Sequence, residues 1–279
     1  MAVCYRHPNR ETGVSCSNCG KPICPDCMTA TPVGMRCPDC SRQRTRTRTV
    51  RSMSTDPRAT YTIIGICVVL WLGEVAGGGK ITEDLSLLAG AHDFAHNKDI
   101  GVAAGQWWRL VTGGFLHDRT NPLHILFNMY VLYWLGTMLE PTLGRARFVA
   151  LYGASLLTGA LGAVLAVSSG TPTVGASGAV FGLMGAAFVL QRMRGVDPMQ
   201  SGIGPVILLN LGLSFLIPGI SIGGHIGGLI GGAACGFLLE RLSRRGVALQ
   251  VAACAVIGVA AAVAAILVCY SKFNSATGF

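Results

Sequence analysis

Residues 148–190 read FVALYGASLLTGALGAVLAVSSGTPTVGASGAVFGLMGAAFVL, and none of these side chains carries a formal charge. A helix crosses the hydrocarbon core of a bilayer with ~20 residues, so an apolar run of ~40 residues predicts two consecutive spans. Uncharged runs also cover 120–139, 198–239 and 247–270. The sequence therefore predicts an all-α polytopic membrane protein.

The overall composition excludes the common soluble classes of protein. Of the 279 residues, 51% are hydrophobic and only 13% are charged. A soluble domain carries about a quarter charged residues, so this chain has too little charge to cover a water-facing surface. We therefore exclude a soluble enzyme, a disordered regulator and a coiled coil.

Seven spans are predicted, and the loops between them set their direction. The expected spans are 59–76, 122–139, 147–167, 175–191, 202–216, 221–240 and 247–270. Every second loop is short and rich in arginine, and such loops stay in the cytoplasm under the positive-inside rule. We expect a cytoplasmic amino terminus, with spans two, four and six beginning at the outer side of the plasma membrane. No apolar stretch precedes Tyr61, so we expect no cleavable signal peptide.

Seven of the 11 cysteines lie in the first 40 residues, spaced as metal ligands. With one histidine they form four pairs, and each pair has two residues between its members: Cys4 and His7, Cys16 and Cys19, Cys24 and Cys27, Cys37 and Cys40. Eight paired ligands suit two tetrahedral zinc ions. A disulfide framework is the alternative, which the paired spacing and the expected reducing compartment disfavour. We expect a zinc-finger domain at 1–41 that folds with its metal.

The order of these ligands resembles the B-box and RING-like cross-braced zinc fingers. That resemblance implies one zinc on Cys4, His7, Cys24 and Cys27, and the other on Cys16, Cys19, Cys37 and Cys40. A cytoplasmic protein partner is one candidate contact for such a finger.

A basic linker is expected at 42–58, between the finger and the first span. Its arginines alternate with small polar residues and are Arg42, Arg44, Arg46, Arg48 and Arg51. Attraction to anionic lipid or, more weakly, to nucleic acid would explain them. A positive flank that sets the topology already explains them and is the preferred interpretation. We expect no nucleic-acid partner.

Polar residues gather at the outer ends of the even-numbered spans. Span two opens with His124 and Asn128, span four with Gly175 and Ser177, and span six with His225. Hydrogen-bonding groups at membrane depth are costly and tend to mark functional sites. We therefore predict a shared pocket near the outer leaflet.

Helical spacing places the serine and the histidine on glycine-rich faces. The faces are Ser177, Gly178, Phe181, Gly182 and Gly185 on span four, and Gly224, His225, Gly228, Gly231 and Gly232 on span six. Glycine faces let two helices approach closely, which would bring the serine within reach of the histidine. A serine beside an imidazole base is the minimal activated nucleophile for acyl transfer. Because no acidic residue lies inside either span, we predict a dyad without a third member.

Further residues are expected to complete this site. Phe181, one turn below Ser177, is a candidate to stack on the histidine ring. His124, Asn128 and the Ser177 backbone N–H are candidate oxyanion-hole donors, since the first N–H groups of a helix lack intrahelical partners. Each residue taken alone has an ordinary structural explanation, such as a serine that bonds back to its own helix. Their conjunction favours catalysis.

These motifs together resemble the rhomboid intramembrane serine proteases, over the region from Tyr61 to about Glu240. The matching elements are Trp108-Arg109, His124-x-x-x-Asn128, Gly175-Ala176-Ser177-Gly178 and His225-x-x-Gly228-x-x-x-Gly232. The resemblance implies Ser177 as nucleophile and His225 as base and leaving-group acid. It implies that His124, Asn128 and the Ser177 amide form the oxyanion hole.

The same resemblance implies the architecture. Six helices at 59–241 would form a rhomboid core that packs through Gly178, Gly182, Gly228 and Gly232, and a seventh helix at 246–271 would follow. Trp108 and Arg109 would belong to a half-embedded loop between spans one and two that braces the fold. Two features depart from the family pattern: Phe181 stands where many relatives have tyrosine, and an insert at 118–122 precedes His124. The zinc finger lies outside the family core.

We expect a serine endopeptidase that cuts transmembrane segments of membrane proteins near the outer leaflet, with no cofactor for catalysis. Its partners would be transmembrane substrates and the lipid bilayer. A non-catalytic rhomboid-like binding or quality-control factor is the alternative, although such a protein would normally have lost the serine or the histidine. A transporter would need intramembrane carboxylates or broken helices in repeated halves, which the sequence lacks.

Six more polar residues lie in the outer loop or near span ends. His92, His96 and His117 are expected to be exposed loop residues and not metal ligands. Glu74, Glu140 and Glu240 are expected to anchor span ends at the interface, with Glu140 capping the inner side.

Overall fold

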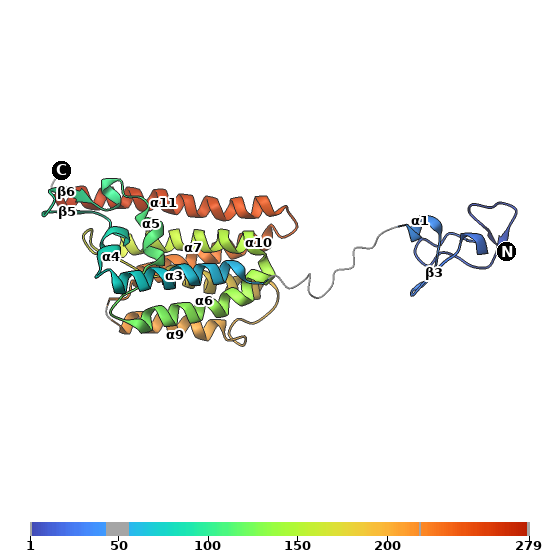
Figure 1. Cartoon of the computed structure of the whole chain (residues 1–279), viewed down its shortest axis with the longest axis horizontal. Helices are drawn as coiled ribbons and strands as arrows, with labels where there is room; N and C mark the ends of the chain where they lie inside the picture. Colours follow the sequence, from blue (N-terminus) through green and yellow to red (C-terminus); the bar gives the residue numbers. More distant parts are fainter. Residues whose placement is uncertain (1, 43–55, 218, 278–279) are drawn as a thin grey trace. The chain divides into compact units, whose positions relative to one another are not determined.

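The computed structural model describes residues 2–42, 56–217 and 219–277. The chain divides into two compact units, Met1–Ser54 and Thr55–Phe279, which Figure 1 shows as a small cysteine-rich fold and a helical bundle.

The amino-terminal unit is a small fold built around its cysteines. Strand β1 (Ala2–Val3) pairs with β2 (Glu11–Thr12), and β3 (Thr29–Thr31) pairs with β4 (Gly34–Arg36). A 3-10 turn, η1 (Pro25–Cys27), and a short helix, α1 (Pro38–Ser41), complete it. The buried apolar side chains described here are Ile23 and six of the seven cysteines. Because so little hydrocarbon is buried, ligand–metal bonds are the natural source of this unit's stability.

In the described part of the second unit, seven helices lie where the sequence predicts the spans. They are α3 (Arg58–Ala76), α6 (Pro122–Leu143), α7 (Arg145–Ala166), α8 (Ser177–Met193), α9 (Ile203–Leu216), α10 (Ile222–Arg241) and α11 (Val247–Thr277). Most ends fall within a few residues of the predicted ones. Two predicted ends are wrong. Helix α6 runs through Pro141 to Leu143, because a proline in the last turn removes only one ladder bond. Helix α11 continues beyond Tyr270 to Thr277.

The helices differ in length, and therefore in whether each could cross a bilayer alone. By length and composition, α3, α7, α10 and α11 are each able to cross a bilayer alone. The apolar helices α8 and α9 have only 17 and 14 residues. At 1.5 Å per residue, α9 extends ~21 Å, which is less than the ~30 Å hydrocarbon core. Helices α8 and α9 are therefore the short helices of a bundle whose other helices are longer.

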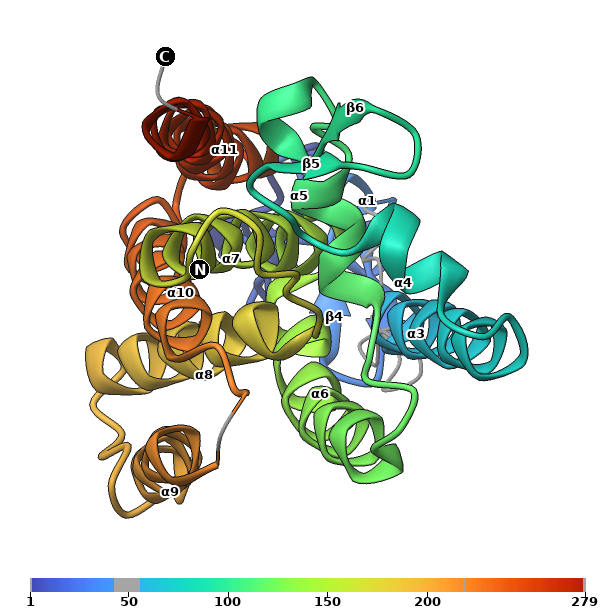
Figure 2. The same ribbon diagram turned by 90° about the vertical axis from the view of Figure 1, so that its left-hand side faces the viewer.

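Helices α7, α8 and α10 pack closely against one another (Figure 2). A side chain at Gly228 would collide with the Gly178 carbonyl, and one at Gly162 would collide with the Gly223 carbonyl. Glycine is required at these positions because the backbones themselves are in contact. Helix α3 packs on α6, and α11 packs on α7. The all-α fold predicted from the apolar runs is confirmed.

The segment between α3 and α6 folds over one end of the bundle. It contains α4 (Lys80–Leu85), the hairpin of β5 (Ala91–Asp93) and β6 (Lys98–Ile100), the 3-10 turns η2 (Val102–Ala104) and η3 (Gly113–Phe115), and α5 (Arg109–Thr112). Arg109 is buried, and its Nη1 donates to the carbonyls of Glu83 and Ser86 at 2.9 Å. Trp108 is 51% exposed. The arginine thus braces this segment, whereas the tryptophan lies on its surface.

Two glutamates expected at the interface are fully buried caps. Glu140 accepts hydrogen bonds from the backbone N–H groups of Ala59 and Thr60 at 2.9 and 2.8 Å, which ties α6 to the start of α3. Glu74 accepts from the backbone N–H of His117 at 3.0 Å. Glu140 thus acts as the cap that the sequence predicts, and each carboxylate satisfies backbone donors that would otherwise be orphaned in an apolar setting. Glu240 pairs with Arg194 at 2.7 Å.

A contact with the end of α7 accounts for the part of α11 that extends beyond Tyr270. Lys272 Nζ donates to three carbonyls at the end of α7, those of Val164, Leu165 and Val167, at 2.7 to 3.0 Å. An ammonium group suits the negative end of a helix. This contact holds the last turns of α11 against α7, although the apolar pattern has already ended.

Candidate active site

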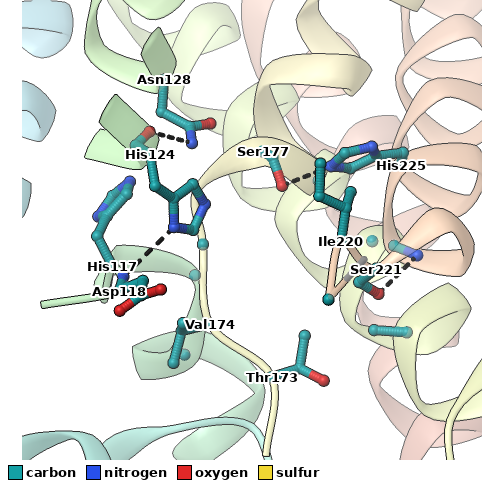
Figure 3. Close-up of a pocket in the computed structure, with 18 of the residues that line it drawn as sticks. His117, Asp118, His124, Asn128, Thr173, Val174, Ser177, Ile220, Ser221 and His225 are labelled. Atoms are coloured by element: carbon teal, nitrogen blue, oxygen red, sulfur yellow. Dashed lines mark hydrogen bonds between the residues drawn. The ribbon is translucent and has the colours of Figure 1, made fainter. Parts of the chain in front are cut away.

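Ser177 is the first residue of α8, and the strand-like segment before it is held by the loop over the bundle end. Thr173 exchanges two backbone hydrogen bonds with Leu87, at 2.8 and 3.0 Å, and Gly175 donates to the Gly113 carbonyl at 3.0 Å. Gly175 has φ +134°, a value that glycine adopts without strain. This turn presents the Ser177 side chain to α10 (Figure 3).

The Ser177 hydroxyl and the His225 ring are in hydrogen-bond contact. His225 lies in the first turn of α10, and its Nε2 is 2.8 Å from Ser177 Oγ (Figure 3). The Phe181 ring stacks on the imidazole, with centroids 4.1 Å apart and an interplanar angle of 18°. The structure therefore brings together the three residues that helical spacing places on the two glycine faces.

Sequence reasoning missed a third contact of the histidine. Ser214, in α9, places its Oγ 2.6 Å from His225 Nδ1. The prediction of a dyad considered only acidic residues in spans four and six as a third catalytic residue. Ser214 is not acidic and lies outside those spans. The available signal was weak: Ser214 is a lone polar residue in the apolar run around Phe215.

His124 sits in the first turn of α6 with a defined orientation. Its Nδ1 accepts a hydrogen bond from the Asp118 backbone N–H at 3.3 Å. A neutral imidazole that accepts at Nδ1 carries its proton on Nε2. That Nε2 faces Gly175, where a Cβ would lie 3.2 Å from it and 3.5 Å from Ser177 Oγ. His124 therefore presents an N–H group to the space beside the serine.

The insert before α6 creates this orientation. Asp118 Oδ1 accepts from the Thr120 N–H at 2.8 Å and from the Thr120 hydroxyl at 2.7 Å. The Thr120 hydroxyl bond, opposed in part by burial, keeps the pKa of the Asp118 carboxyl below its ordinary value. The turn that results points the Asp118 backbone N–H at His124. Residues 118–122 were expected to reshape the outer rim; the contacts here show that they position a candidate oxyanion-hole residue.

Asn128 lies one turn further along α6 and is buried. Its Nδ2 donates to the His124 carbonyl at 2.9 Å (Figure 3). An amide nitrogen has two hydrogens, so one remains for a ligand in the cavity.

A cavity of about 1360 Å³ joins these groups. Ser177, His225, His124 and Asn128 line it, together with Ser214 and residues of the loop over the bundle end. Most of its lining is apolar, with a few convergent polar groups, which is the usual character of a ligand-binding site.

The three outer-loop histidines do not behave alike. His92 pairs with Asp99, and His96 pairs with Asp93, both at 2.8 Å on the exposed hairpin. His117 is fully buried, so the expectation that it is exposed is wrong. Its ring centroid lies 5.2 Å from that of His124, and neither ring nitrogen has a hydrogen-bond partner among the residues that the structure describes. Burial, together with the nearby His124, lowers the pKa of His117 to about 3. None of the three belongs to a group of metal ligands among the described residues.

Comparison with known proteins places this site in a family. Residues 104–242 match the rhomboid domain and include every candidate catalytic and oxyanion-hole residue. The putative rhomboid protease YdcA of Bacillus subtilis (strain 168) is 34% identical over 150 residues, which are 53% of this chain and 74% of that protein. The chain belongs to the rhomboid family. It is a multi-pass membrane protein, and several of its matched relatives are named as proteases.

Two other rhomboid relatives match over longer stretches. Rhomboid protease GluP of Bacillus subtilis (strain 168) is 36% identical over 180 residues, or 63% of this chain. Rhomboid protease GlpG of Haemophilus influenzae is 28% identical over 193 residues, or 67% of this chain and 93% of GlpG. The match to GluP covers 34% of its length, so this chain spans only about a third of that relative.

The amino-terminal unit of this rhomboid protein contains two groups that fit metal ions. They are Cys4, His7, Cys24 and Cys27, and Cys16, Cys19, Cys37 and Cys40, and the ligand atoms within each group lie within 4.8 Å of one another. Zn–S bonds of ~2.3 Å in a tetrahedron separate two sulfurs by ~3.8 Å. Cys19 and Cys37 are 3.8 Å apart, and His7 Nδ1 is 3.3 and 3.4 Å from Cys24 and Cys27. The grouping is the one that the finger resemblance implies.

The chemistry of the ligands also suits a cation. The Cys37 backbone N–H, 3.3 Å from Cys16 Sγ, lowers the pKa of the Cys16 thiol to about 6. A thiolate is the form that binds zinc. All eight residues thus fit a thiolate-binding metal such as zinc.

Proposed function

We propose that this rhomboid protein is an intramembrane serine endopeptidase that uses Ser177 and His225 as a catalytic dyad. The observation that supports this most strongly is the 2.8 Å contact between Ser177 Oγ and His225 Nε2 in a cavity that His124 and Asn128 also line. The sequence relatives named as proteases support the reaction class. The alternative, a non-catalytic binder, has no observation in its favour, since the serine and histidine are both present and in contact.

The reaction follows from this geometry. Ser177 Oγ attacks the carbonyl carbon of the scissile peptide bond, and its proton moves to His225 Nε2. The negative charge on the former carbonyl oxygen is stabilised by the Ser177 backbone N–H, His124 Nε2–H and the free Asn128 N–H. The C–N bond breaks as Nε2 returns the proton to the leaving amine. A water molecule, deprotonated by His225, then hydrolyses the acyl-enzyme and releases the carboxylate product.

The substrate class follows from the position of the site. The arginines Arg58, Arg145, Arg194 and Arg241 lie at one end of the helices, whereas Ser177 and His225 begin theirs at the other end. By the positive-inside rule the arginine end is cytoplasmic, so the site faces the outer leaflet of the plasma membrane. Substrates would be transmembrane segments that unwind locally near that face, because an intact helix shields its peptide bonds.

Reconstitution tests this function directly. The purified full chain in proteoliposomes should cleave a model single-span protein near its outer end, and a fluorophosphonate should label the intact enzyme on one serine. Ser177→Ala should remove the label, and Ser243→Ala, a matched change at the opposite end of the bundle, should retain it. If the wild-type chain binds the substrate but releases it uncut, and takes no label, the non-catalytic alternative is correct.

We further propose that residues 1–41 form a zinc-binding domain, separated by the basic linker from the rhomboid core and the seventh helix. The linker residues 43–55 lie outside the described residues. Under the proposed topology the finger is cytoplasmic and its contacts are with a cytoplasmic protein, not with the catalytic pocket. A panel of substrates cleaved by the chain with and without residues 1–42 tests this: choice of substrate should change more than rate.

Elemental analysis of the purified full chain should find two zinc ions per molecule, because the eight ligands form two separate groups. Cys24→Ser and Cys37→Ser should each lose about one ion, and together they should lose both. Cys67→Ser is the matched control, since this buried cysteine lies in α3 and should leave two ions bound. A wild-type content of one or zero would contradict the assignment.

A further inference from the structure

The catalytic histidine candidate has a hydroxyl group at each of its ring nitrogens. On one side, Ser177 Oγ lies 2.8 Å from Nε2. On the other, Ser214 Oγ lies 2.6 Å from Nδ1 and 2.7 Å from the backbone carbonyl oxygen of Asn210. Ser214 is only 2% exposed, so water does not compete for these contacts.

Counting hydrogens determines which atoms donate. A serine hydroxyl has one hydrogen, and a carbonyl oxygen has none. If Ser214 donated to His225 Nδ1, two oxygens would face each other at 2.7 Å with no hydrogen between them. If Ser214 donates to the Asn210 carbonyl instead, both short contacts are satisfied. This bond to the carbonyl four residues earlier is a habitual geometry of serine in a helix.

The proton on the imidazole is then assigned. The Ser214 oxygen faces Nδ1 with a lone pair, so Nδ1 carries the ring hydrogen and donates it. A neutral imidazole has only one N–H, which leaves Nε2 with a lone pair directed at the Ser177 hydroxyl. This tautomer is the one able to take a proton from serine. In a serine–histidine–aspartate triad, a carboxylate holds the same tautomer.

We propose that Ser214 is a positioning residue that holds His225 in the tautomer able to act as a base. The proposal rests on the proposed dyad function. When Nε2 takes the Ser177 proton, the imidazolium keeps Nδ1–H pointed at Ser214, whose own hydrogen stays on the Asn210 carbonyl. Ser214 neither gains nor loses a proton. The chain of two hydrogen bonds orients dipoles that favour the cation, and it connects α9 to the dyad without an acidic group.

Kinetics in proteoliposomes test the role. Ser214→Ala should lower kcat roughly 10- to 100-fold with KM little changed, part of the ~10²- to 10⁴-fold that a positioned base contributes. Ser214→Thr keeps the hydroxyl and its bond to the Asn210 carbonyl, so it should restore most of kcat. Ser155→Ala is the matched control, because it deletes a buried serine hydroxyl that has no hydrogen-bond partner within the described part of the chain. In this variant kcat should stay within about twofold.

Nitrogen-15 NMR of histidine-labelled full chain gives a readout that does not depend on turnover. The wild-type signals of His225, assigned through His225→Asn, should show a protonated Nδ1 and an unprotonated Nε2, and Ser214→Ala should lose this preference. Unchanged kcat in Ser214→Ala, or a wild-type proton on Nε2 in a chain that still cleaves its substrate, overturns the positioning role without overturning the proteolytic function. A wild-type chain with the expected tautomer but no cleavage overturns the proteolytic function itself.

Discussion

Replacing Ser177 with alanine is expected to reduce kcat/KM for a single-span substrate by roughly 10⁴- to 10⁶-fold, and His225→Ala is expected to do the same. Each change removes a different atom of one proton-transfer unit, since Ser177 Oγ and His225 Nε2 share a hydrogen bond of 2.8 Å. Without the base the hydroxyl is a weak nucleophile, and without the hydroxyl the base has nothing to activate. The double variant should therefore be no slower than either single variant.

Single-turnover cleavage in proteoliposomes measures these losses, and thermal melting in detergent serves as the folding control. The serine change should leave the melting temperature nearly unchanged, because Ser177 lines the cavity and its hydroxyl is small. The histidine change removes the ring stacked on Phe181, so His225→Gln is the second variant if His225→Ala is unstable. Additive losses, or appreciable turnover in Ser177→Ala, would show that the two residues do not act as a dyad.

Gly232→Ala is expected to prevent stable assembly of the bundle, with loss of most folded protein and of activity. A Cβ at this position would collide with the carbonyl group and Cα of Gly182 on α8. Both obstacles are backbone atoms, which have no alternative rotamer, so α8 and α10 must move apart. Ser177 and His225 lie on these same two helices, and the separation would also break their contact. We expect a destabilisation at or above the ~1–3 kcal/mol usual for overpacking.

The control is Gly65→Ala in α3, where a Cβ meets nothing within 4 Å. That substitution should be neutral or slightly stabilising, because alanine favours a helix by up to ~1 kcal/mol over glycine. Yield after purification and melting temperature compare the two. A Gly232→Ala protein that melts at the wild-type temperature would show that α8 and α10 tolerate a wider separation than their contact implies.

Residue spacing along one helix does not predict which ring nitrogen of His124 carries the proton, or that His117 is buried. The His124–Asn128 pair was recognisable because residues four apart share a helix face. The turn at Asp118 that orients His124 depends on two hydrogen bonds from Thr120. His117 is buried by a loop that folds back over the bundle, held by Glu74 through its backbone. Neither loop has a periodic pattern from which its path could be predicted.

The helices, the rhomboid family and the faces on which Ser177 and His225 lie could all be predicted from the amino-acid sequence. Uncharged runs of bilayer length predict helices, and a period of 3.6 residues fixes which side chains share a face. The contact of Ser214 with His225 Nδ1, and the capping of α3 by Glu140 from 80 residues away at Thr60, could not be predicted without the packed helices. The first contact joins two consecutive helices and the second joins helices that are far apart in the sequence. In both cases the partner depends on how the helices rotate and slide when they pack. No local pattern carries that information, because backbone and side-chain polar groups buried in an apolar bundle take whichever partner the packing brings within reach.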